Sequence, residues 1–175
     1  MFLSVFEMFK IGVGPSSSHT MGPMVAAGRF LDQLRASAFR PSGLGASLHG
    51  SLAFTGVGHA TDRATILGLA GFLPETYDQK AAEAALTAIQ ATRQVSPADL
   101  GTLAFNPKTD LVFDYDRVLP GHANGLVFVA KDAQGDVDVQ ETFDSIGGGF
   151  VLTETEMNEG SAKDEGAEVP YPFKS

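Results

Sequence analysis

The chain contains no cysteine among its 175 residues. This absence excludes disulfide bonds, zinc sites built on thiolates and cysteine nucleophiles together. It also excludes an iron–sulfur cluster ligated by this chain alone, because cysteine thiolates hold such clusters. Four histidines remain as side chains that exchange a proton near neutral pH. No two of them have the H-E-x-x-H spacing of a metal-binding helix.

Positive charge is also scarce. The chain has 12 Lys and Arg against 21 Asp and Glu, which gives a formal net charge of −9 and an isoelectric point near 4.7. This balance argues against nucleic acid or an anionic membrane as the main partner. No apolar run reaches the roughly 18 residues of a membrane span. Residues 1–10 lack the basic start of a secretory signal, so we expect a soluble, cytoplasmic protein.

Hydrophobic residues make up 43% of the chain, enough for one buried core. Apolar spacing predicts helices over residues 5–10, 21–36, 61–70 and 76–93. Alternation predicts strands over residues 44–54, 111–115, 125–131, 137–143 and 150–155, with His49 on the polar face of the first. The pattern indicates a single α+β domain with helices packed on a mixed or mostly antiparallel sheet. We assign residues 1–156 to this domain and the acidic residues 157–175 to a linker toward another domain.

The most unusual motif spans residues 12–20, directly before a predicted helix. Two glycines precede a segment that we call the serine loop, which consists of Ser16, Ser17, Ser18, His19 and Thr20. The amides and dipole of a helix N-terminus, together with several hydroxyls, favour a small carboxylate. Ordinary helix capping explains one hydroxyl residue but not the whole run. His19 adds a candidate acid or base.

Two further loops combine glycine with histidine. His59 lies within residues 56–62, again between a strand and a helix, and is a second candidate acid or base. His122 and Asn124 stand two residues apart, so on an extended backbone they point to the same side and can hold one ligand. A turn at Asn124 is an equal alternative. Residues 145–150 indicate a hinge or a close approach of backbone, because three of them are glycines.

Residues 4–24, with the motif GPSSSHT, resemble the opening of bacterial iron–sulfur L-serine dehydratases, also called L-serine ammonia-lyases. The resemblance continues through residues 50–62, 122–125 and 145–150, and so covers nearly the whole chain. Related sequences often carry proline where Ala123 stands here, which leaves this loop less rigid.

The resemblance implies conversion of L-serine to pyruvate and ammonia without pyridoxal phosphate. It implies a [4Fe–4S] cluster whose cysteines belong to a separate α domain, the expected partner of this chain. The chain itself then corresponds to the β domain. That domain is also similar to the allosteric substrate-binding domain of some phosphoglycerate dehydrogenases, which implies the same fold.

Two roles follow for the domain. In the first, His19 and His59 are catalytic, and a second set of residues binds substrate: Ser16, Ser17, Ser18, Thr20, His122 and Asn124. In the second, the domain is a non-catalytic module that senses serine and dimerises. Which histidine acts as the base stays open at this point. We expect a homodimer, and we expect the isolated chain to be inactive because it lacks thiolate ligands.

Overall fold

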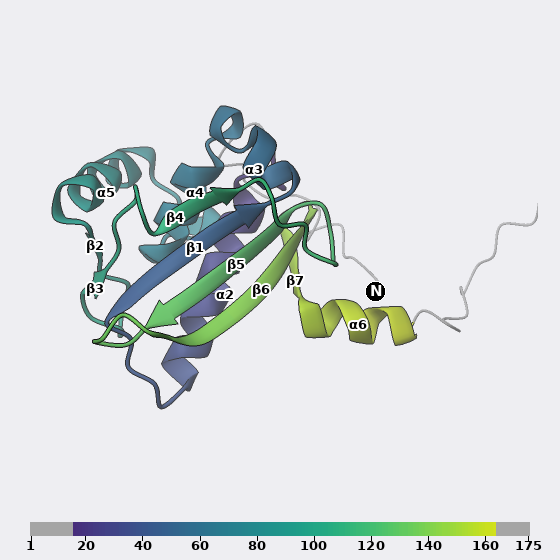
Figure 1. Cartoon of the computed structure of the whole chain (residues 1–175). Helices are drawn as coiled ribbons and strands as arrows, with labels where there is room; N and C mark the ends of the chain where they lie inside the picture. Colours follow the sequence, from purple (N-terminus) through teal and green to yellow (C-terminus); the bar gives the residue numbers. More distant parts are fainter. Residues whose placement is uncertain (1–15, 164–175) are drawn as a thin grey trace, which may run out of the picture.

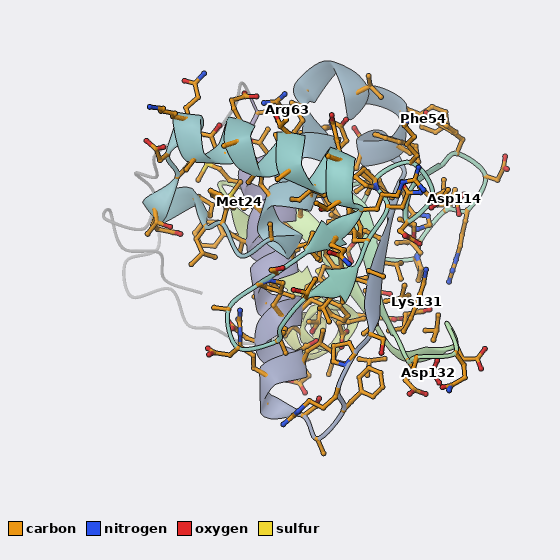
Figure 2. The ribbon with its side chains drawn as sticks, turned by 90° about the vertical axis from the view of Figure 1, so that its left-hand side faces the viewer. Met24, Phe54, Arg63, Asp114, Lys131 and Asp132 are labelled. Carbon is orange, nitrogen blue, oxygen red and sulfur yellow. The ribbon has the colours of Figure 1, made fainter. Side chains whose placement is uncertain are left out.

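The helix predicted over residues 21–36 organises the domain. In the computed structural model, which describes residues 16–163, it is helix α2 (Met21–Ala36) with the predicted bounds. Its buried side chains, such as Met24 and Phe30, pack on one face of a mixed sheet (Figures 1 and 2). Helix α4 (Thr61–Leu69) packs on α2, and α5 (Gln79–Thr92) packs on α4. The single α+β domain predicted from the sequence is confirmed.

The sheet contains seven strands among the described residues, in the order β2-β3-β1-β5-β6-β7, with β4 also paired to β1. Strand β1 runs parallel to β3 and β4, and the other pairings are antiparallel. Leu48, Leu126 and Phe143 pair across three neighbouring strands and form one buried row of the core. The strands are β1 (Gly43–His49), β2 (Gln94–Val95), β3 (Leu103–Ala104), β4 (Leu111–Asp114), β5 (Gly125–Lys131), β6 (Val137–Gly147) and β7 (Phe150–Thr153).

The helices predicted over residues 61–70 and 76–93 are confirmed as α4 and α5. Helix α5 begins at Gln79 because Asp78 caps the helix: its side chain accepts a hydrogen bond from the Ala81 amide at 2.7 Å. The shorter helices are α3 (Ser51–Thr55), η1 (Val57–His59), η2 (Pro74–Thr76) and α6 (Glu154–Lys163). Within residues 16–163, no helix combines the length and apolarity that a membrane span requires.

The strand predicted over residues 44–54 is wrong beyond His49. Gly50 has a φ of +56°, a left-handed conformation that ends β1 and that side chains other than glycine rarely adopt. A Cβ at this position would lie 2.3 Å from the carbonyl oxygen of Ala123. The chain therefore turns sharply at Gly50, and Ser51–Thr55 forms α3 instead of continuing the strand.

The polar face of the strand predicted that His49 lies at the surface or supports other residues of a site, and the surface alternative is wrong, since this side chain is only 2% exposed. Its Nδ1–H donates to the carbonyl oxygen of Arg117 at 3.2 Å, and its Nε2 accepts from the Ser47 hydroxyl at 2.8 Å. His49 therefore ties β1 to the loop that follows β4, and both ring nitrogens are used in doing so.

The C-terminal part differs from the prediction as well. The strand predicted over residues 150–155 ends at Thr153, and α6 occupies the beginning of the predicted linker. Thr153 and Glu156 form a reciprocal capping box, with distances of 2.8 and 3.2 Å. Arg29 of α2 pairs with Glu156 at 2.7 Å, and its hydrogen bond lowers the pKa of that carboxyl. The division at residue 156 stays a prediction, and the helix predicted over residues 5–10 lies outside the described residues.

We expect Gly50→Ala to lower the free energy of unfolding by about 2 kcal/mol or more, because it combines backbone strain with a clash. Gly58→Ala is the matched control, since a Cβ there meets nothing within 4 Å. This control should change the free energy of unfolding by less than about 0.5 kcal/mol. Urea denaturation followed by circular dichroism measures both. Equal stability of the two variants would show that the turn at Gly50 accepts a side chain.

Candidate active site

Three loops that the sequence singled out meet at one end of the sheet. His19 of the serine loop contacts Thr55 at the end of α3, with 2.9 Å between Nε2 and Oγ1. The amide of Ser51 donates to the carbonyl oxygen of Ala123 at 2.7 Å and attaches the third loop to α3. Ser145 of β6 donates its hydroxyl hydrogen to the Ser18 carbonyl oxygen at 2.8 Å. The tight turn at Gly50 makes this convergence possible.

The two candidate catalytic histidines lie against each other. The ring centroids of His19 and His59 are 4.7 Å apart, and the rings are tilted by 39°. His19 is buried, with 9% of its surface exposed, whereas His59 is half-buried. The sequence predicted a related role for both histidines but contained no signal that they are neighbours. Their contact is the central feature of the site.

Thr55 fixes the protonation pattern of His19. Its hydroxyl hydrogen goes to the Ser51 carbonyl oxygen at 2.8 Å, because a carbonyl only accepts. Thr55 Oγ1 must therefore accept from His19 Nε2–H. In the neutral ring, His19 Nδ1 is then the acceptor for the hydroxyls of Ser18 at 3.0 Å and Ser16 at 3.2 Å.

The opposite pattern holds for His59. Its Nδ1 lies 2.9 Å from the carbonyl oxygen of Thr55, so Nδ1 carries the hydrogen. In neutral His59 the lone pair is therefore on Nε2, which forms no hydrogen bond with the described part of the chain. Of the two rings, His59 is the one that offers a free basic nitrogen.

Burial lowers the pKa of His19 below its ordinary value, because the charged ring loses hydration. The neighbouring charge of His59 acts in the same direction, and a hydrogen bond to the Ser51 backbone opposes both. Two imidazolium rings this close repel each other, so a positive charge on His59 makes protonation of His19 less favourable.

The serine loop uses part of its own hydrogen-bonding capacity. The Thr20 hydroxyl donates to the Ser16 carbonyl oxygen at 2.7 Å, and Thr20 is 2% exposed. The Gly22 amide donates to the Ser17 carbonyl oxygen at 2.9 Å. Pro23 has no amide hydrogen, so the start of α2 offers fewer donors than a typical helix N-terminus. The hydroxyls of Ser16, Ser17 and Ser18 are thus the more available groups of this loop.

The third loop is held by β6. The buried Asn124 side chain donates to the Ser145 carbonyl oxygen at 3.1 Å. The backbone amide of Asn124 donates to His122 Nδ1 at 3.2 Å. Neutral His122, which is exposed, therefore carries its hydrogen on Nε2. The Asp144 carboxylate accepts from the His122 amide at 3.1 Å. Burial raises the pKa of Asp144 although this hydrogen bond opposes the shift.

The close approach of backbone predicted for residues 145–150 is present. The Gly148 amide donates to the Ser17 hydroxyl oxygen at 3.1 Å, and the three glycines of the turn all have positive φ angles. Sequence reasoning missed the residues that organise the site, namely Ser51, Thr55, Asp144 and Ser145. Ser51 and Thr55 are four residues apart on one helical turn, a signal that the incorrect strand prediction concealed.

The residues of this chain do not fit an iron–sulfur cluster. The chain has no cysteine, and the described residues contain no group of three or more potential metal ligands. A cluster would have to be held by residues that the chain does not contain.

The fold and the site define an α+β domain that presents a histidine pair beside a serine-rich loop. The chain belongs to the serine dehydratase beta chain family, because the model of that family matches residues 4–156. It is similar to L-serine dehydratases of Streptomyces coelicolor (38% identity, covering 100% of this chain and 39% of the relative) and Helicobacter pylori (40% identity, covering 98% and 38%). The L-serine dehydratase TdcG of Escherichia coli is 37% identical, covering 99% and 38%. The chain thus spans about two-fifths of the length of these curated relatives.

The His19 ring should titrate below about 6.5, the ordinary value for histidine. His59→Gln should move this midpoint upward, because it removes the second positive charge. The unfolded chain binds this proton more readily than the folded one, so folding stability should fall as the pH drops below about 6.5. NMR titration of the ring protons measures the midpoint, and His19→Gln assigns the resonance. A midpoint above 6.5, or no shift in His59→Gln, would contradict the assignment.

Proposed function

We propose that this chain is the β part of an L-serine dehydratase that converts L-serine to pyruvate and ammonia. Membership of the family and the whole-chain similarity to L-serine dehydratases support this proposal. The observation that carries it is the contact between a histidine with a free basic nitrogen and a loop rich in hydroxyls. Such a pair suits removal of a proton next to a carboxylate.

In this reaction the α-proton and the β-hydroxyl of serine leave, the latter as water. The resulting aminoacrylate tautomerises to an imine, which water hydrolyses to pyruvate and ammonia. We assign the removal of the α-proton to His59 Nε2. The Thr55 carbonyl oxygen fixes Nδ1–H and so keeps the opposite nitrogen basic. His19 is a weaker candidate for this step because both of its nitrogens already have partners.

The serine loop would bind the substrate carboxylate. The hydroxyls of Ser16, Ser17 and Ser18 lie on one short turn beside the histidine pair. The exposed His122 can add its Nε2–H to the same ligand, since Nδ1 is occupied by the Asn124 amide. Asn124 itself anchors the loop to β6, because its side-chain amide donates to Ser145. We place Thr20 among the residues that shape the loop.

An apolar patch next to the site suits the remaining part of the enzyme. We define this patch by Phe54, Val57 and Tyr115, which are 70%, 69% and 52% exposed. The Phe54 and Tyr115 rings pack edge to face at 5.3 Å, and Phe54 lies at the outer surface on the same side as Asp114 (Figure 2). Phe54 directly precedes Thr55, whose carbonyl oxygen accepts from His59, so the patch borders the histidine pair. We propose that the part of the enzyme corresponding to the rest of the relatives' length docks here and supplies any cluster ligands.

We expect His59→Gln to reduce kcat by roughly 10²–10⁴-fold with little change in KM, as for loss of a general base. His19→Gln should act mainly on KM, because it disturbs the carboxylate-binding hydroxyls. The assay combines the chain with the part corresponding to the rest of the relatives' length, on one polypeptide or two. If His59→Gln keeps its maximal rate and alters only the saturation curve, the serine-sensing role replaces the catalytic one.

Phe54→Asp should weaken binding between this chain and the part of the enzyme that corresponds to the rest of the relatives' length. We expect the affinity to fall by at least about tenfold, the effect expected at an interface hot spot. Val137→Asp is the matched control. Val137 is 50% exposed and apolar, but it lies at the end of β6 remote from Gly147 and the serine loop. Calorimetry or sedimentation of the separately produced parts measures both affinities. Unchanged binding in Phe54→Asp, or equal weakening in both variants, would exclude the patch as the docking surface. Loss of self-association by Phe54→Asp would instead assign the patch to a homodimer.

A further inference from the structure

The direction of the hydrogen bonds in the site can be followed from one fixed end. The Ser51 carbonyl oxygen only accepts, so it takes the hydrogen of the Thr55 hydroxyl. Thr55 Oγ1 in turn takes the hydrogen on His19 Nε2, and His19 Nδ1 takes the hydrogen of the nearer serine hydroxyl, that of Ser18. Every hydrogen in this row points toward the Ser51 carbonyl oxygen.

This direction conflicts with binding of an anion. A carboxylate needs hydrogen-bond donors, but neutral His19 Nδ1 takes a hydroxyl hydrogen from Ser18 at 3.0 Å or from Ser16 at 3.2 Å, so that hydrogen is not available to the ligand. Ser17 is less affected, since its hydroxyl oxygen accepts from the Gly148 amide and its own hydrogen stays available. With His19 neutral, the serine hydroxyl that donates to Nδ1 presents only lone pairs to the ligand, and its contact with a carboxylate is repulsive.

A proton on His19 removes the conflict. Protonated His19 donates from both ring nitrogens, so Nδ1–H goes to the Ser18 oxygen and the Ser18 hydroxyl hydrogen turns toward the ligand. The anion in turn stabilises the positive ring beside it. Among the described residues, His59 is the ionisable group whose charge acts on His19, and the two rings, with centroids 4.7 Å apart, repel each other when both are charged.

We propose that the serine loop binds a carboxylate together with a proton on His19, so that ligand binding charges His19 and leaves His59 Nε2 free as the base. The inference rests on the proposed function, because it takes the serine loop as the carboxylate site. Thr55 is the positioning residue, since its hydroxyl oxygen sets which nitrogen of His19 faces the loop. The proton comes from solvent and returns to solvent when the ligand leaves.

The test uses the full 175-residue chain and 3-hydroxypropionate as the probe. This compound has the carboxylate and hydroxyl of serine but no amino group to add its own proton exchange. Calorimetric titration in two buffers of different ionisation enthalpy counts the protons taken up. At a pH above the pKa of free His19, we expect uptake of up to about one proton per ligand, and the dissociation constant should rise by up to about tenfold per pH unit. Propane-1,3-diol, which lacks the charge, is the control ligand and should cause no uptake.

Variants locate the proton. His19→Gln should bind the probe more weakly and without proton uptake. Thr55→Val removes the nearer acceptor for Nε2–H, leaving the Ser51 hydroxyl at 3.4 Å, and should reduce the uptake, whereas Thr55→Ser keeps the hydroxyl and should preserve it. The bond from His59 to the Thr55 backbone is retained in both Thr55 variants. Nitrogen-15 shifts of the ring nitrogens should show Nε2–H in free His19 and both nitrogens protonated in the complex.

Each contrary result overturns a different statement. Binding of the probe by the unaltered chain without proton uptake, or uptake that persists in His19→Gln, would overturn the coupling but leave the carboxylate site. No binding of the probe at millimolar concentration would overturn the carboxylate site itself, and the coupling with it. Equal uptake in Thr55→Val and Thr55→Ser would remove Thr55 from the proposal.

Discussion

The turn at Gly50 is the constraint on which the rest of the site depends. A continuing strand would carry Ser51 and Thr55 away from the serine loop, whereas the left-handed turn folds them into one helical turn beside His19. The Ala123 carbonyl oxygen lies so close to Gly50 that the third loop is positioned by the same turn. One residue without a side chain thus brings together segments that are far apart in the sequence.

Within that arrangement, Thr55 contacts both histidine rings. Its backbone oxygen orients one histidine and its hydroxyl oxygen orients the other, which leaves the two neighbouring rings in opposite tautomers. Equivalent rings would compete for the same role, but these two are differentiated by the atom that each one contacts. The difference between the two rings therefore originates in short-range hydrogen bonds, because among the described residues no carboxylate forms a hydrogen bond with either ring.

Much of the fold could be predicted from periodicity. Helix α2 and strand β5 have the predicted bounds, because their apolar patterns are long and lie between clear turn residues. The strand prediction failed at Gly50 because alternation of small and apolar residues continues through a turn that only the positive φ reveals. The capping box of Thr153 and Glu156 was visible in the sequence as a T-x-x-E motif, yet strand alternation led to the opposite conclusion. The site residues His19 and His59 were found from glycine-flanked motifs. Their contact and the role of Thr55 could not be, because tertiary distances are absent from local sequence patterns.

The contacts of the site also indicate at which stage of folding the site can form. The bond from Ser145 to Ser18 joins residues 127 positions apart, and the bond from His19 to Thr55 joins residues 36 apart. Contacts of such long sequence separation form after the loops between them have closed, which is entropically costly until the core supports them. A nascent or partly unfolded chain therefore has two ordinary, separate histidines and no acid–base pair. The contact between the two histidines is in this way confined to chains that have finished folding, and the state of the pair is a direct readout of native topology.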